Sequence, residues 1–265
     1  TQADNTMDFD FDSDQIALRD SVRRYMRNAV VPRIAECEKE RKIPLDLLAG
    51  LSEFGYIGGM LPEEAGGLGL DYVTWAMLLE EAGYHWGALR TILNITNVFM
   101  RLVNAHGTPE QKAHFLEPVL ASKKAVAAAF SEPNHGSNPA GIEARAEDKG
   151  DHYLLNGTKL WITNGVAADF VIVLARLHGP QGDLGHSLFL IDKAEAPIEA
   201  RLVDKMVLKA SGTSELFLND VKLPKSALLG AAGAALKIVS VGLNSGRLNI
   251  AMGAVGAAQA ALDLS

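Results

Sequence analysis

The stretch "YLLNGTKLWITNG" at residues 153–165 combines alternating strand residues with turn residues, and it does most to define the fold. The Asn156-Gly157 pair favours the positive φ angles of a type I′ turn, so two strands are expected to meet there as a β-hairpin. Other short segments after Ser122 are apolar, often β-branched or alternating, and separated by turn residues. The expected strands are 125–131, 141–147, 152–155, 158–163, 169–176, 186–191 and 213–219. Strands at this spacing predict a compact barrel or sandwich.

The second half of this stretch, "KLWITNG" at 159–165, raises a question about its two faces. Side chains alternate along a strand, so Leu160 and Ile162 are expected to face a core. Trp161 and Thr163 then share the opposite face. A lone Trp on a strand is more often packed in a core than exposed as a cofactor platform, and the sequence alone leaves both interpretations open.

The first 121 residues have helical periodicity and predict a helical N-terminal domain. Ser13 is a plausible cap for the first helix, and a short helix is expected after Pro44. "TPEQ" at 108–111 predicts a helix start, because Thr and Gln form a capping box with Pro at the first helical position. Residues 122–227 form the predicted β-domain that follows.

From residue 228 onward the pattern is helical again and rich in Ala and Gly, which predicts the first helix of a further, incomplete helical domain. Small residues on this helix predict close packing against other helices. No C-cap glycine or polar tail precedes Ser265, so we expect this apolar helix to pair with other chains or to continue in a longer polypeptide. The predicted fold class is α+β with several domains.

The composition excludes several classes of protein. The 265 residues are 48% hydrophobic and 22% charged, which excludes a disordered chain. The net charge of -7 argues against a nucleic-acid partner. A single cysteine, Cys37, excludes an internal disulfide framework. The acidic start "TQADNTMDFDFDSD" has neither signal nor transit-peptide features, and the apolar runs are too short to cross a membrane. We therefore expect a soluble protein.

Common cofactor and catalytic motifs are missing from the sequence. It has no G-x-G-x-x-G after a strand, no P-loop, no H-E-x-x-H and no G-x-S-x-G nucleophile elbow. The histidines lack ligand spacing, so no metal site is expected, and His106, His114 and His135 are interpreted as surface or turn residues.

A second informative stretch, "FSEPNHGSN" at 130–138, places small, hydroxylated and turn-forming residues directly after an apolar strand. A strand end that opens into Gly136-Ser137 can present N–H groups and hydroxyls to an anion or to the edge of a polar ring. The same composition also fits a simple loop.

With "FSEPNHGSN" followed by "LNGTKLWITNG", the chain resembles the acyl-CoA dehydrogenase family of flavoproteins. Further stretches in the family's order are "PEEAGGLGL", "HGTPEQKAHFLEPVLAS", "ADFVIVLAR", "TSELFLNDVKLP" and "LNSGRLNIAMGAVGAAQAAL". The resemblance implies a helical N-terminal domain, a middle β-domain and a C-terminal helical bundle. It also implies FAD as cofactor and the α,β-dehydrogenation of an acyl-CoA thioester.

The resemblance also implies site residues, carried over from matching positions. The implied FAD contacts are Phe130, Ser131, Gly136, Ser137, Trp161, Ile162 and Thr163. The implied contacts to the CoA substrate are Ser137, Asn244 and Arg247. Ser131 stands where the family usually has Thr, and Asn138 and Asn244 each replace a commoner Asp.

No catalytic residue is expected within the chain. In most family members the base is a glutamate late in the C-terminal domain, outside these 265 residues. In a minority it directly precedes the arginine matched by Arg247, where this chain has Gly246, which cannot act as a base. The alternatives are a truncated chain of a full-length enzyme, a non-catalytic chain, or a member with other flavin chemistry, such as an oxidase, monooxygenase or desaturase.

The substrate and partners follow only from the resemblance. Arg90 lies near the position where glutaryl-CoA dehydrogenases place an arginine for the distal carboxylate, although the spacing differs by one residue. It is either a substrate contact or an ordinary exposed arginine. The resemblance further implies an acyl-CoA ligand, electron-transfer flavoprotein as acceptor and a homotetramer or dimer. The implied location is the bacterial cytoplasm, or the mitochondrial matrix after presequence removal.

Overall fold

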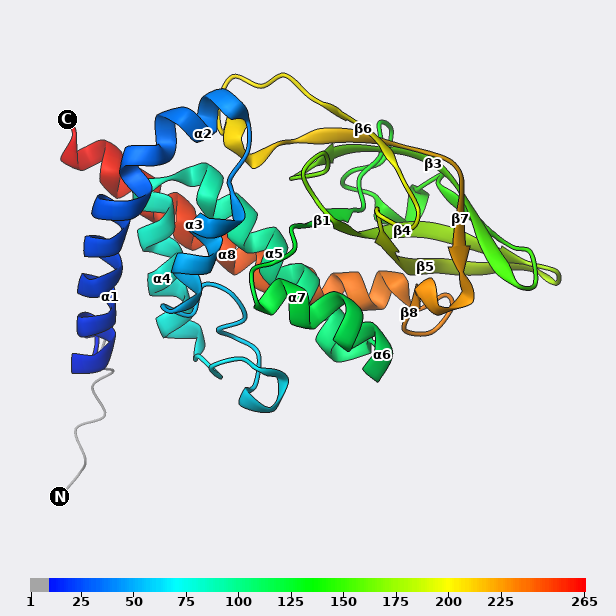
Figure 1. Cartoon of the computed structure of the whole chain (residues 1–265), viewed down its shortest axis with the longest axis horizontal. Coiled ribbons are helices and arrows are strands. Elements are labelled where there is room, and N and C mark those ends of the chain that lie inside the picture. Colours follow the sequence, from blue (N-terminus) through cyan, green and yellow to red (C-terminus); the bar gives the residue numbers. More distant parts are fainter. Residues whose placement is uncertain (1–9) are drawn as a thin grey trace.

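A computed structural model describes residues 10–265, which form a helical part, a β-sheet and a long final helix (Figure 1). Residues 1–9, which include most of the acidic start, lie outside the described residues. The helices of the first part are α1 (Ser13–Tyr25), α2 (Ile34–Glu40), α3 (Leu45–Ser52), α4 (Tyr72–His85), α5 (Gly87–His106), α6 (Pro109–Gln111) and α7 (Glu117–Leu120). No helix in the described residues is long and apolar enough to span a membrane.

The sheet and the last helix complete the fold. The strands are β1 (Val126–Ala129), β2 (Arg145–Asp148), β3 (His152–Ile162), β4 (Phe170–Gly179), β5 (Gly182–Asp192), β6 (Glu199–Leu202), β7 (Ser214–Pro224) and β8 (Leu228–Leu229). They form one mixed sheet in the order β6-β7-β3-β2-β4-β5-β8, with β1 paired to β4. The final helix, α8, spans Ala235–Asp263. The predicted fold class, helical then β then helical, is confirmed.

Local capping chemistry sets where the helices start. The predicted capping box between Thr108 and Gln111 is present. The predicted cap at Ser13 is wrong by one residue, because Asp12 caps α1 and forms a reciprocal capping box with Gln15. The Asp12 carboxylate accepts the Gln15 N–H at 2.7 Å, which satisfies a donor that the helix leaves free.

Strand β4 is buried on both faces, which explains its continuous apolar sequence "FVIVLA". Phe170, Ile172 and Leu174 pack into the core shared with the helices. Val171 and Val173 pack into a second core on the other side of the sheet. A strand covered on both faces has no solvent-facing positions, so its sequence does not alternate.

The predicted hairpin at Asn156-Gly157 is wrong, because β3 runs through this pair as one strand. The register against β7 shifts between Leu155 and Gly157, which marks a β-bulge. Asn156 exchanges two hydrogen bonds with Asp220 across the bulge, each 2.9 Å long. Gly157 has a φ of 144°, and a Cβ there would lie 2.7 Å from the Ala144 Cβ. The glycine therefore serves a bulge and a close contact instead of a turn.

Helix α8 joins the two halves of the molecule, running from β5 to α4 and α5 (Figure 1). Its backbone crosses α4 so closely that a Cβ on Gly256 would lie 1.9 Å from the Glu80 carbonyl oxygen. A Cβ on Gly83 would likewise lie 2.1 Å from the Gly253 carbonyl oxygen. The predicted close packing through small residues is confirmed.

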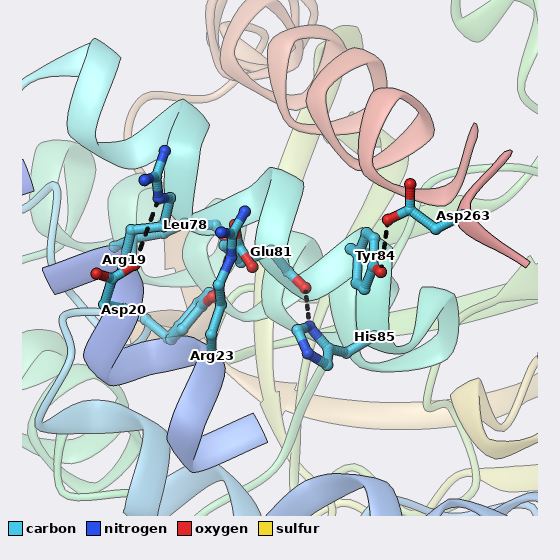
Figure 2. A network of polar contacts seen from close by, with 9 residues as sticks. Arg19, Asp20, Arg23, Leu78, Glu81, Tyr84, His85 and Asp263 are labelled. Atoms are coloured by element: carbon cyan, nitrogen blue, oxygen red, sulfur yellow. Dashed lines mark hydrogen bonds and ion pairs between the residues drawn. The ribbon is translucent and has the colours of Figure 1, made fainter. Parts of the chain in front are cut away.

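Polar contacts fasten the C-terminal part of α4 to two other helices, as Figure 2 shows. Arg23 of α1 donates to Oε1 of the buried Glu81 through Nε at 2.8 Å and Nη2 at 2.7 Å. Three residues further along α4, the Tyr84 hydroxyl donates to Asp263 of α8 at 2.8 Å. Helix α4 is thus held between the first and last helices of the described chain.

Candidate functional site

Two adjoining cavities lie where the sheet meets α5 and α8. The first has a volume of about 510 Å³ and is lined by Asn94, Ile95 and Val98 of α5, Ala128 of β1, the segments 130–131 and 161–163, and Leu243, Gly246, Arg247, Ile250 and Ala251 of α8. The second has a volume of about 560 Å³ and is lined by residues of the 130–139 segment and of α8. The two share Phe130, Ser131, Leu243 and Arg247. Their size is that of small-molecule sites in proteins.

Most of the residues expected from the sequence come together at these cavities. Phe130, Ser131, Trp161, Ile162, Thr163 and Arg247 line the first cavity. Gly136, Ser137 and Asn244 line the second, again with Phe130, Ser131 and Arg247. Arg90 lines neither, although it lies one helical turn before Asn94 on α5. Segments more than 100 residues apart in the chain thus meet at one place.

The indole of Trp161 is 60% exposed at the cavity, so this Trp is not a core residue. Its φ is 64°, and the register of β3 shifts between Lys159 and Ile162. The expected alternation is therefore broken: Lys159 and Ile162 are buried, whereas Leu160 is only partly buried. Thr163 lies just past the end of the strand. A bulge in β3 is what turns the indole outward.

The most deeply buried ion pair of the site, Lys159–Glu132, was not expected from the sequence. Lys159 is fully buried and Glu132 is 6% exposed, with Nζ and Oε1 2.7 Å apart. Lys159 Nζ also donates to the Phe130 carbonyl oxygen at 3.2 Å. The Glu132 carboxylate accepts the N–H of Glu143 at 2.6 Å and that of Ala144 at 2.9 Å. A lysine in an alternating strand is usually predicted to lie on the surface, so this buried pair becomes visible only in the folded structure.

Burial and hydrogen bonding both act on this pair. Burial raises the pKa of Glu132, but the Lys159 hydrogen bond and the two backbone N–H groups outweigh it and leave the pKa below its ordinary value. Burial lowers the pKa of Lys159, and the contact with Glu132 partly offsets this. Each partner thus favours the charged form of the other.

No Asp, Glu or His is among the described residues that line the first cavity. Gly246 lies on its wall, and a Cβ there would meet only the Asn94 Oδ1 atom, at 3.8 Å. The cavity wall at Gly246 therefore has space for a side-chain atom, although glycine itself has no side chain.

Arg90 has two unsatisfied nitrogen atoms at the α5–α8 contact. Its Nε and Nη1 atoms are buried and have no hydrogen-bond partner, and burial lowers the pKa of the guanidinium. Its side chain packs over Gly253, where a Cβ would come within 2.6 Å of the Arg90 Cδ. Buried guanidinium nitrogens without a hydrogen-bond acceptor are costly. A ligand that brought an acceptor to Arg90 would offset this cost.

A cluster of metal-ligand type lies elsewhere. His114, Asp192 and Glu195 bring ligand atoms within 4.8 Å of one another, although His114 and Glu195 are exposed. The spacing of the histidines gave no sign of this group, because Asp192 and Glu195 come from the end of β5 and the turn after it.

Comparison with known proteins places this arrangement in a family. The model of the acyl-CoA dehydrogenase N-terminal domain matches residues 12–123, and the model of the middle domain matches residues 127–221. The short-chain specific acyl-CoA dehydrogenase of Clostridium acetobutylicum is 32% identical over 259 residues, covering 97% of this chain and 68% of that protein.

Solved structures agree with the sequence match. A glutaryl-coenzyme A dehydrogenase in complex with glutaryl-CoA aligns with a TM-score of 0.89 at 34% identity, covering 97% of this chain and 66% of the other. The glutaryl-CoA dehydrogenase of Mycobacterium smegmatis in complex with FADH2 aligns with a TM-score of 0.87 at 32% identity, covering 96% and 64%. The chain thus spans about two thirds of the length of these relatives. It belongs to the acyl-CoA dehydrogenase family.

Proposed function

We propose that this chain is the flavin- and thioester-binding portion of an acyl-CoA dehydrogenase, with FAD as its cofactor. The observation that carries the proposal is the outward-facing indole of Trp161, 60% exposed on the wall of a cavity that also holds Arg247. Aromatic side chains are prominent in the linings of ligand pockets, so an indole on a cavity wall offers a surface for a ligand. A flat ring system such as a flavin matches a flat indole.

The residues present fit this cofactor. Trp161 and Phe130 offer apolar surface at the cavity, and the hydroxyls of Ser131 and Thr163 offer hydrogen bonds to the polar edge of a ring. In the second cavity, Gly136 and Ser137 are exposed on a loop and provide small, polar surface suited to a pyrophosphate. Arg247, which donates to Asn244 Oδ1 at 2.9 Å, supplies positive charge for phosphate groups.

The proposed reaction removes two hydrogens from the acyl chain of a CoA thioester. The thioester carbonyl makes the α-proton acidic, a carboxylate base takes it, and the 2-enoyl-CoA product results. Bound FAD would supply the hydride acceptor for the hydrogen on the β-carbon. The chain's own residues bind and orient both partners, while the base comes from outside the two cavity linings, because neither contains an Asp or Glu.

A dicarboxylic acyl-CoA, such as glutaryl-CoA, is a second candidate substrate. The unpartnered Arg90 nitrogens favour it, because Arg90 lies one helical turn from Asn94, which lines the first cavity. A distal carboxylate reaching past Asn94 would satisfy this buried guanidinium. Electron-transfer flavoprotein as acceptor, assembly as a homotetramer or dimer, and location in the bacterial cytoplasm or mitochondrial matrix remain predictions that accompany this function.

The experiment that tests the proposal is an anaerobic visible spectrum of the purified protein with FAD, before and after addition of acyl-CoA thioesters. A flavin band that shifts on binding of one thioester supports the cofactor and the ligand class. Bleaching of the band additionally identifies a base in the preparation. Failure to retain FAD overturns the proposal, whereas retained FAD that responds to no thioester points to other flavin chemistry.

A further inference from the structure

The buried Lys159–Glu132 pair lies directly behind the wall that holds the exposed indole. Neither residue lines either cavity, and both are buried from solvent. The pair is nevertheless close to the site in the chain, since Lys159 is two residues before Trp161 and Glu132 directly follows Ser131. It can therefore act on a ligand only through the backbone that it holds.

The contacts of the pair tie three separate segments together. Lys159 Nζ donates to the Phe130 carbonyl oxygen at 3.2 Å and to Glu132 Oε1 at 2.7 Å, which fixes the end of the 130–132 segment on β3. The Leu160 N–H donates to the Ser131 carbonyl oxygen at 3.0 Å and extends this attachment by one residue. Hydrogen bonds to the backbone carbonyls of Phe130 and Ser131 thus fix the positions of these two residues at the cavity wall.

The same carboxylate also closes the loop that carries Gly136 and Ser137. Glu132 stands at the start of this loop and accepts the N–H groups of Glu143 and Ala144 at its end, at 2.6 and 2.9 Å. A single side chain thereby joins the two ends of the 132–144 segment. The loop between them is mostly exposed, and the Glu132 carboxylate adds to the reciprocal backbone bonds of Glu132 with His135 and to the His135–Glu143 pair that also restrain it.

Packing alone does not explain a charged pair here. A buried ion pair costs desolvation, and apolar residues of similar volume often stabilise a core equally well. Apolar side chains could not hold the Phe130 carbonyl or the two loop N–H groups. The advantage of the pair is therefore geometric, in that it selects one arrangement of the cavity wall.

We propose that the Lys159–Glu132 pair positions the flavin-facing wall, by fixing Phe130 and Ser131 on β3 and by closing the 132–144 loop at its base. This inference rests on the proposed FAD function and deepens it. The two residues are positioning residues, because they touch the wall and not the ligand.

The test uses the whole 265-residue chain and three variants at the pair: Lys159→Met, Glu132→Gln and the double variant. The double variant leaves no unpaired buried charge, so we expect it to fold even where a single change does not. The matched control is Lys149→Met, which breaks an exposed Lys–Glu pair with a comparable Nζ–Oε2 distance of 2.6 Å to Glu147. Circular dichroism and thermal melting establish that each variant is folded.

Two measurements follow on the folded variants. Titration with FAD should give a Kd at least about tenfold higher for the pair variants than for the original chain, with a changed flavin spectrum, whereas the control stays within about twofold. Hydrogen exchange of the 130–144 peptides should be faster in the pair variants and unchanged in the control.

The outcomes separate the two proposals. A folded double variant that binds FAD as tightly as the original chain, with the same spectrum, overturns the positioning role and leaves the FAD function intact. An original chain that binds no FAD overturns the proposed function. In that case hydrogen exchange alone tests whether the pair positions the wall. Unchanged exchange in the 130–144 peptides then overturns the positioning role as well.

Discussion

The Trp75 indole donates to Asn249 Oδ1 at 2.9 Å, across 174 residues of sequence. Because an indole N–H can only donate, it fixes which end of the Asn249 amide accepts. The Asn249 amide nitrogen then donates to Asn94 Oδ1 at 2.8 Å. The amide nitrogen of Asn94 is left as a donor at the first cavity, so a buried tryptophan on α4 sets the polarity of a cavity residue on α5.

Replacing Asn249 with Ala should destabilise the protein by about 1–3 kcal/mol, because the buried Trp75 N–H then has no acceptor. Urea unfolding followed by circular dichroism measures this loss. Asn244→Ala, at an exposed position of the same helix, is the matched control and should change stability by less than about 0.5 kcal/mol. Equal effects of the two changes would show that the hydrogen bond is not the cause.

Glycines of α8 should differ sharply in their tolerance of a methyl group. Gly256→Ala places a Cβ 1.9 Å from a backbone oxygen of α4, so the helices must separate, at a cost of about 1–3 kcal/mol. Gly246→Ala has open space and should stabilise the helix by roughly 0.5–1 kcal/mol. Thermal melting of both variants checks the opposite signs, and a loss of stability for Gly246→Ala would contradict the open wall described above.

The loss of folding stability at acidic pH should depend on Glu132. Its pKa is lower in the folded protein than its ordinary value of 4.5, so the folded state binds this proton less readily than the unfolded state. The stabilisation is complete above pH 4.5 and is lost as the pH falls through the lowered pKa of the folded state. Urea midpoints between pH 3 and 6 should therefore fall less steeply for Glu132→Gln than for the original chain, and parallel curves would be inconsistent with an ionised buried Glu132.

A carboxylate placed at Gly246 should supply a base in the first cavity. A Cβ on Gly246 meets no close neighbour, and the residue lines the cavity, so we expect the Gly246→Glu side chain to enter it; a positioned general base contributes about 100-fold or more to proton abstraction. Anaerobic flavin reduction by butyryl-CoA, followed by stopped flow, should be faster in this variant than in Gly246→Gln, which has the same shape without the base. Equal rates would mean that this wall does not face the α-carbon.

Arg90→Ala tests the dicarboxylate hypothesis through binding. Loss of a charge-assisted hydrogen bond should weaken glutaryl-CoA binding by roughly tenfold or more and leave butyryl-CoA binding within about threefold. Arg101→Ala provides the control, because Arg101 lies on the same helix, also has a buried unpartnered nitrogen, and lines neither cavity. Isothermal titration with both thioesters measures the ratio, and an unchanged preference in Arg90→Ala removes Arg90 from the site.

Sequence reasoning predicted elements that depend on local chemistry. The Thr108–Gln111 capping box and the strand expected at 169–176, which is β4, follow from the pattern of a few neighbouring residues, and both were predicted correctly. It failed at Gly157, where the reason for glycine is the nearby Ala144, and it missed β6, a strand of only four residues that are exposed or partly buried. These features depend on neighbours that only the folded chain supplies.

The candidate site divides in the same way. Trp161 and Ser137 were found because their motifs are specific to a family, and the fold brings both to adjoining cavities. Lys159, Glu132 and Asn94 were missed, since a Lys on a strand or an Asn on a helix is ordinary on a surface. Only the tertiary pairing of β3 with the 130–144 segment, and of α5 with α8, brings these side chains to the candidate site.

The crossing of α4 and α8 bears on how the protein is made. Helix α4 emerges during synthesis well before Gly253 and Gly256, with which its backbone makes its closest approach. Closing so long a loop is slow and entropically costly, and domains otherwise tend to fold as they are synthesised. The α4 surface that α8 covers therefore stays exposed until α8 has been made, so docking of α8 is expected to follow the folding of the helical first part and of the sheet.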